Sequence, residues 1–220
     1  MTFVLAAALA VAINPSGHWE GAVDTPQTSI AMQVDFAPVN GELAGAITIP
    51  QQHIAGLPLT KIVIDGSSIT FGARSDQLMA GTVEDDGKRM SGTFSLGSLS
   101  FPFTLTRTGE PKLAPRPTSA PFGEELEGTW HGALSDTSGQ LQLLLTMVNR
   151  PDGSAVATIV NLDEGSLQLP VVVSKNGSKV TIESHVVESA FTGELRASGE
   201  LVGTFHQGAF EIPLTFARER

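Results

Sequence analysis

Apolar and polar residues alternate along much of this chain, which is the pattern of a β-strand that buries one face. Every second residue is large and apolar in residues 30–36, 99–105 and 141–147. After residue 12, no stretch sustains the 3.6-residue period of a helix over about ten residues. The sequence therefore predicts an all-β protein.

Asn-Gly and Asp-Gly pairs separate the alternating stretches, for example at Asn40-Gly41 and Asn176-Gly177. Such pairs favour the positive-φ turns of tight β-hairpins. In the first half of the chain we expect strands at 17–24, 29–37, 42–49, 57–64, 68–73, 78–83, 90–95 and 99–107. A meander of eight strands removes its edges by closing into an up-and-down barrel, and a flattened two-sheet sandwich is the alternative.

Several motifs occur twice, at an offset of 111 residues. The matching segments are 17–21 and 128–132 (Gly-x-Trp-x-Gly), 92–94 and 203–205 (Gly-Thr-Phe), and 101–107 and 212–218. A period this long indicates two domains, because solenoid repeats are much shorter. The predicted fold is two tandem antiparallel up-and-down eight-stranded barrels, at 13–107 and 128–220.

A proline-rich linker is predicted at 108–127, where four prolines fall within eleven residues. Proline fixes φ and lacks a backbone N–H, so we expect an extended, semi-stiff connector. Residues 1–12 are interpreted as a signal-peptide remnant, because an apolar run there ends in Ala10-Val11-Ala12. A short terminal helix or a first strand is the alternative. The expected location is secreted or periplasmic.

The composition excludes some partners. The formal net charge is −10, with acidic residues in both halves and no basic stripe. Nucleic acid and anionic membranes would be repelled, so neither is expected as a partner, and no membrane insertion of the mature chain is expected. The chain has no cysteine, which rules out disulfides and thiolate chemistry.

The two tryptophans and two arginines occupy matching positions. Trp19 and Trp130 lie in the first strand of each repeat, and Arg107 and Arg218 end the last strand. In a closed meander the first and last strands are neighbours, so each guanidinium can lie on an indole ring. We interpret both pairs as structural plugs that close one end of a barrel, with a ligand site as the alternative.

These residues carry a family resemblance. Gly-x-Trp in the first strand and a closing arginine resemble the lipocalin-type barrel. The fuller pattern is similar to a small β-barrel module found ahead of α/β-hydrolase domains in exported bacterial proteins. It is also similar to uncharacterised exported proteins made of two such modules. The resemblance covers residues 17–107 and 128–218, and it implies a β-barrel fold in both.

No catalytic or metal-binding motif stands out. The sequence has no Gly-x-Ser-x-Gly elbow, no His-Glu-x-x-His and no phosphate loop. None of its five histidines is repeated at a matching position, so each is interpreted as a surface or strand-end residue. We expect no catalytic residue, no metal and no cofactor.

Three classes of function stay open. The first choice is a non-catalytic accessory or protein-interaction module that docks on an exported protein partner. The second is a carrier of a small apolar ligand inside a barrel, and its candidate ligand-binding residues are Phe101, Phe103, Phe205 and Phe210. A filled interior is the expectation, since eight short strands enclose little space. An enzyme with an unrecognised inter-domain site is the third.

Overall fold

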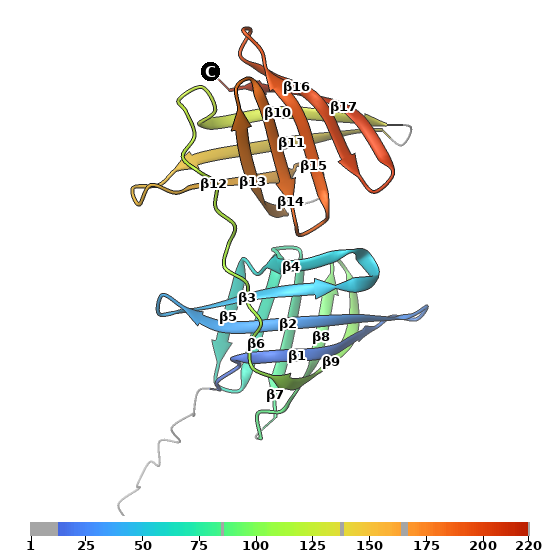
Figure 1. The fold of residues 1–220 in the computed structure, drawn as a ribbon. Coiled ribbons are helices and arrows are strands. Elements are labelled where there is room, and N and C mark those ends of the chain that lie inside the picture. Colours follow the sequence, from blue (N-terminus) through green and yellow to red (C-terminus); the bar gives the residue numbers. More distant parts are fainter. Residues whose placement is uncertain (1–12, 85, 137–138, 164–166, 220) are drawn as a thin grey trace, which may run out of the picture. The chain divides into compact units, whose positions relative to one another are not determined.

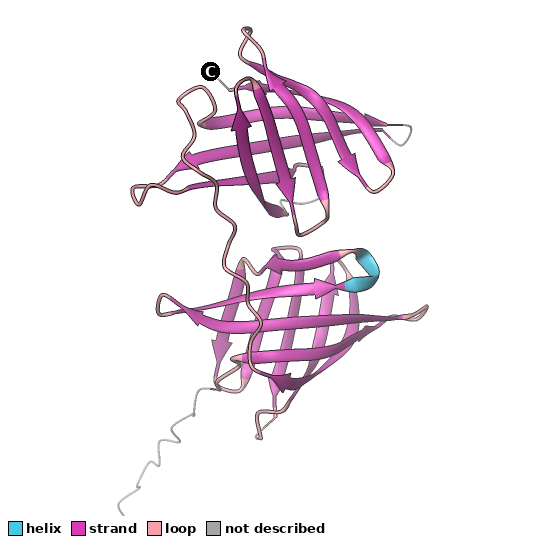
Figure 2. Cartoon of the chain, in the orientation of Figure 1, coloured by secondary structure: helices cyan, strands magenta, loops and turns pink. Residues whose placement is uncertain are grey.

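The computed structural model describes residues 13–84, 86–136, 139–163 and 167–219 (Figure 1). These residues form strands throughout, and the one helical turn among them is a 3-10 turn at Pro50–Gln52 (Figure 2). The predicted all-β class is confirmed. The segment interpreted as a signal-peptide remnant lies outside the described residues.

Contacts between Cα atoms divide the chain into two compact units. The first takes in the described part of Met1–Thr48 together with Pro58–Leu113, and the second takes in Ile49–Leu57 together with Ala114–Arg220. Each unit has an antiparallel sheet, and the sheet of the first unit also includes Ile54–Pro58, most of which the contacts assign to the second unit.

The sheet of the second unit is a closed barrel of eight strands. In order these are β10 (Gly128–Asp136), β11 (Gly139–Asn149), β12 (Ala155–Asn161), β13 (Gln168–Asn176), β14 (Lys179–Ser184), β15 (Ser189–Leu195), β16 (Glu200–Gln207) and β17 (Phe210–Arg218). Each strand pairs with the next, and β10 pairs with β17 to close the ring. This is the up-and-down barrel that the sequence predicts.

The sheet of the first unit is strongly curled into a half-barrel. Its strands are β1 (Gly17–Asp24), β2 (Ser29–Val39), β3 (Glu42–Ile49), β4 (Ile54–Pro58), β5 (Lys61–Asp65), β6 (Ser68–Arg74), β7 (Gln77–Val83), β8 (Arg89–Leu96) and β9 (Leu99–Gly109). Their spatial order is β4-β3-β2-β1-β9-β8-β7-β6-β5, so β1 pairs with both β2 and β9 as expected.

The closure of the first sheet differs from the prediction because the strand expected at 57–64 is broken in two. Pro58, at the end of β4, has no N–H to give to a ladder. The backbone N–H groups of the next two residues donate to different strands. Leu59 N donates to Gly45 O on β3 (2.9 Å), and Thr60 N donates to Gly72 O on β6 (3.0 Å). The chain thus passes from one end of the sheet to the other at a kink. In the second unit, β13 is uninterrupted and pairs with both β12 and β14.

Aromatic side chains form the centre of both cores. In the first unit, Phe71 packs edge-to-face against Phe36, with ring centroids 5.1 Å apart, and against Phe103, at 6.3 Å. In the second unit, Phe191 and Phe216 pack edge-to-face at 5.5 Å. All five rings are fully buried, and such edge-to-face pairs add to the free energy gained by burying their area.

The second half of the proline-rich segment packs on the second unit. Phe122 and Leu126 are buried in the barrel core. Asn149 holds this stretch from β11: its side chain accepts a hydrogen bond from Phe122 N (2.8 Å) and donates to Phe122 O (3.1 Å) and to Glu127 (3.2 Å). The residues that lead into the barrel are therefore part of its core.

An ion pair also fixes this stretch. Lys175 on β13 donates a hydrogen bond to Glu125, and this bond holds the pKa of the Glu125 carboxyl below its usual value.

Candidate ligand-binding site in the closed barrel

The antiparallel meander gives the closed barrel two distinct ends. At one end, β10 begins at Gly128 and β17 finishes at Arg218. At the other end, β12, β14 and β16 finish at Asn161, Ser184 and Gln207.

Trp130 and Arg218 lie at the first end, as cross-strand partners on β10 and β17. Trp130 is fully buried, and its Nε1 donates to Leu126 O at 2.8 Å. The guanidinium carbon of Arg218 lies 6.0 Å from the indole centroid, and Nη2 donates to Glu127 O. Indole and guanidinium together satisfy two backbone carbonyls of the segment that crosses this end.

The first unit repeats this arrangement. Trp19 is fully buried and donates from Nε1 to Pro15 O at 2.8 Å. Arg107 is its cross-strand partner on β9, with the guanidinium carbon 4.8 Å from the indole centroid, and it donates to Asn14 O. Each arginine thus lies on the tryptophan 88 residues before it, with both side chains engaged in backbone hydrogen bonds.

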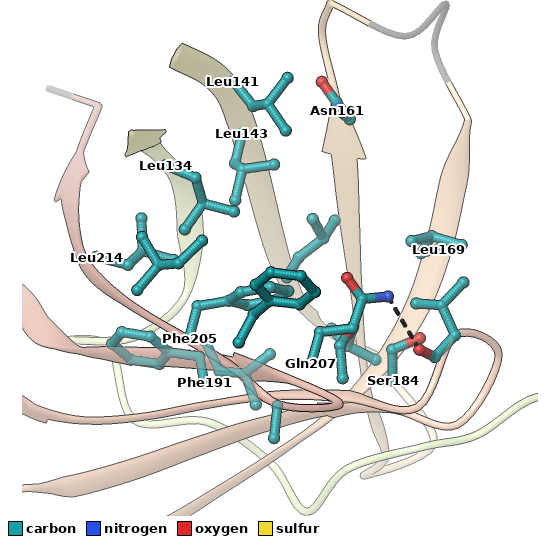
Figure 3. Close-up of a pocket in the computed structure, with 18 of the residues that line it drawn as sticks. Leu134, Leu141, Leu143, Asn161, Leu169, Ser184, Phe191, Phe205, Gln207 and Leu214 are labelled. Atoms are coloured by element: carbon teal, nitrogen blue, oxygen red, sulfur yellow. Dashed lines mark hydrogen bonds between the residues drawn. The ribbon is translucent and has the colours of Figure 1, made fainter. Parts of the chain in front are cut away.

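The other end of the closed barrel contains a pocket of about 530 Å³ (Figure 3). This volume falls within the usual range for small-molecule sites. Aliphatic side chains from β10, β11, β13, β14 and β17 line much of it, and two phenylalanines, Phe191 and Phe205, line it from β15 and β16. No described residue that lines the pocket carries a charge.

Two residues that line the pocket are smaller than their counterparts in the first unit. At an offset of 111, Phe71 corresponds to Ile182 and Phe103 corresponds to Leu214. In the first unit these two rings pack against each other in the core. In the second unit Ile182 and Leu214 line the pocket instead, so the pair of rings formed by Phe71 and Phe103 has no counterpart there.

Three polar lining residues lie side by side on one wall of the pocket, and Asn161 and Gln52 line it elsewhere. Ser184, Ser189 and Gln207 are successive cross-strand neighbours on β14, β15 and β16. Gln207 Nε2 donates to Val187 O at 3.2 Å, which fixes the amide group. Figure 3 shows Ser184 and Gln207 close together, away from Leu141 on the far wall.

The four phenylalanines named as candidate ligand-binding residues do not come together. Phe205 and Phe210 both line the pocket, and Phe210, at its rim, is 71% exposed. Phe103 is buried in the core of the first unit, and Phe101 is half-buried on the same strand. The pocket residues Ile182 and Leu214 were missed, although their smaller size relative to Phe71 and Phe103 is visible when the two halves are aligned.

His18 lies at the start of β1, in keeping with the strand-end interpretation, but it is buried and not a surface residue. Its Nδ1 lies 2.8 Å from Asp35 Oδ1 and its Nε2 lies 3.1 Å from Glu20 Oε1. Lys112 N also donates to Asp35 Oδ1, at 2.7 Å. Both ring nitrogens lie within hydrogen-bond distance of carboxylates. The cluster therefore ties the start of the proline-rich segment to β1 and β2.

The described residues also lack two other features. No group of three or more His, Cys, Asp or Glu side chains there is arranged to hold a metal ion. Among the same residues, no helix is long and apolar enough to cross a membrane.

No protein-family model matches the chain, and no curated protein matches it significantly. Solved structures that resemble it include a protein of unknown function from the DUF3598 family of Nostoc punctiforme, with 10% identity over 93% of this chain and 96% of the other. Another is a "putative outer membrane protein" of Bacteroides fragilis, with 11% identity over 93% of this chain and 97% of the other. Both TM-scores are 0.28, too low to carry an argument, so the fold described above rests on the strand pairing.

Proposed function

We propose that the closed barrel binds a small apolar molecule in the pocket opposite the Trp130–Arg218 plug. The pocket of about 530 Å³ is the observation that carries this proposal. Aliphatic and aromatic groups line most of it, so an apolar ligand would gain free energy from leaving water there. The sequence alone favours a filled interior and an accessory role, and the open pocket reverses that order.

Binding can be tested with diphenylhexatriene, an uncharged hydrocarbon that fluoresces strongly only in apolar surroundings. We expect saturable binding to the full chain. Leu214→Phe introduces at the pocket wall the residue type that the first unit has at the matching position, Phe103. It should weaken binding by about tenfold or more, because the added ring fills space that the probe needs. The matched control is Val148→Phe, which adds the same ring at a position that is 44% exposed. Equal affinity in all three proteins would contradict the proposal.

We also propose that this protein is exported, because an apolar run occupies much of residues 1–12. Detection of the mature chain outside the cytoplasm of its own host, with its N-terminus near Ile13, would support this extension. A full-length cytoplasmic product would contradict it.

An accessory module is the second candidate, and one observation favours it. Leu96 and Leu99 are cross-strand partners at the β8–β9 hairpin, and they are 39% and 55% exposed. Exposed apolar pairs of this kind suit a protein contact. Native mass spectrometry of the chain purified from its host should then show a protein partner that Leu96→Ser/Leu99→Ser loses. A partner held equally by the double variant would argue against this surface.

A further inference from the structure

The pocket contains one buried polar atom that has nothing to bind. Ser184 is 5% exposed, and its Oγ has no hydrogen-bond partner among the described residues. Val180, Ile182 and Ser184 alternate with more exposed residues along β14, so the Ser184 side chain lies on the inner face of the strand. A buried hydroxyl without a partner is unfavourable and uncommon in folded proteins.

We infer that the ligand is an uncharged amphiphile, with an apolar body inside the barrel and one hydroxyl or carbonyl group that bonds to Ser184. This inference rests on the proposed function and specifies the class of ligand. The serine hydroxyl can both donate and accept, so it matches either head group. Its counterpart in the first unit, 111 residues earlier, is Ala73, so the hydroxyl belongs to the unit that has the pocket.

The position of the polar groups sets the orientation of the ligand. Gln207 is exposed at the mouth, next to Ser189 and, through it, Ser184. The wall opposite is mostly aliphatic, as Leu134 and Leu141 show in Figure 3, with Asn161 as its polar residue. A molecule that fits both parts lies with its head at β14–β16 near the mouth and its apolar body against the leucines.

The charges around the pocket favour an uncharged head. No described lining residue is charged, so an ionised group would lose water without gaining a counter-ion. Glu183 and Glu188 flank Ser184 and the hairpin that follows it, and both are exposed. Together with a net charge of −10, they would repel a carboxylate. The structure therefore favours a long-chain alcohol or ketone over a fatty acid.

The test compares decanol and decanoate, which share a chain length and differ in the head group. Each displaces diphenylhexatriene from the full chain, from Ser184→Ala and from the control Ser174→Ala, which removes an exposed hydroxyl on β13. We expect decanol to bind the unaltered protein more tightly than decanoate does. Ser184→Ala should weaken decanol about fivefold or more and leave the hydrocarbon probe unchanged, because the probe makes no hydrogen bond.

The outcomes separate this inference from the function on which it rests. If the probe binds but Ser184→Ala leaves decanol affinity unchanged, the pocket binds ligands and the role of Ser184 is wrong. Decanoate binding as tightly as decanol would overturn the uncharged head group. If neither the probe nor decanol binds the unaltered protein, the proposed function itself fails.

Discussion

Each tryptophan anchors the start of its sheet through its ring and through one hydrogen bond. Trp19 and Trp130 are both fully buried, and each donates to a carbonyl four residues earlier in the chain. A buried N–H needs such a partner, and the arginine over each ring supplies a cation to its face. At this scale, one side chain both fills the core and holds the segment that enters the sheet.

Replacing Trp19 separates these two contributions. Trp19→Ala should lower the free energy of unfolding by about 3–5 kcal/mol, because it removes a large core side chain. Trp19→Phe keeps most of the ring volume and loses the bond to Pro15, so its cost should be about 1–3 kcal/mol. Denaturant melts measure both values. A loss under about 1 kcal/mol for Trp19→Ala would show that the ring is not a core anchor.

Gly203 permits close contact between two strands of the closed barrel. A Cβ built there lies 2.2 Å from Thr192 O and 2.4 Å from Gly193 Cα. Gly203→Ala should therefore destabilise the protein by about 1–3 kcal/mol or more, because backbone atoms must move. Gly109→Ala is the control, since nothing lies within 4 Å of its Cβ position. Equal thermal melting of the two variants would contradict the expected clash.

At the scale of elements, the stretch before β10 behaves as part of the barrel. Phe122 and Leu126 contribute to the core, and Asn149 and Ser119 fix the backbone around them. Ser119 makes a two-way bridge with Ala155 on β12 (2.8 and 3.1 Å), and its hydroxyl accepts from Val173 N at 2.8 Å. Prolines stiffen the chain here, and these specific bonds determine where it lies.

Asn149→Ala should release this stretch. It removes the side-chain bonds to Phe122 and Glu127, so the amide hydrogens of 119–127 should exchange faster while the barrel strands stay protected. Hydrogen-exchange mass spectrometry reports both regions. The control Gln140→Ala alters an exposed residue of the same strand, and equal exchange in both variants would count against the anchoring role of Asn149.

At the scale of the whole molecule, each compact unit contains one tryptophan. Trp19→Phe leaves Trp130 to report on the second unit, and Trp130→Phe leaves Trp19 to report on the first. Leu126 is 1% exposed in the second core, so Leu126→Ala should cost about 2–5 kcal/mol there.

That loss should appear in one fluorescence transition and not in the other. In the Trp19→Phe background, Leu126→Ala should move the denaturant midpoint down, and in the Trp130→Phe background the midpoint should stay unchanged. A shift of similar size in both backgrounds would show that the two units unfold together, contrary to this expectation.

The alternating pattern predicted most of the strands, because the alternation of apolar and polar residues can be read from neighbouring residues in the sequence. Strands β1 and β3 have the predicted bounds, and most others extend past them by one or two residues. The break at Pro58 was not predicted, and the proline alone does not explain it, since the matching Pro170 lies inside an unbroken strand of the second unit. Hydrogen bonds made at Leu59 and Thr60 decide the difference, and they depend on distant partners.

The candidate site was only partly predictable, since a pocket depends on which side chains share an interior. Phe205 was correctly placed on an inner face, but alternation alone does not tell a filled barrel from a hollow one. His18 and Asp35 lie 17 residues apart and meet because the β1–β2 register pairs them. That register could have been counted outward from the intervening hairpin, which is the signal that the sequence offers.

The plug at Trp130 has a kinetic consequence. Because Trp130 is fully buried at that end, a ligand of the proposed kind would exchange through the opposite end, where Gln207 and Phe210 line the pocket and are exposed. Substitutions at Gln207 or Phe210 would then change the rates of both entry and exit, and the affinity would change wherever the ligand contacts the replaced side chain.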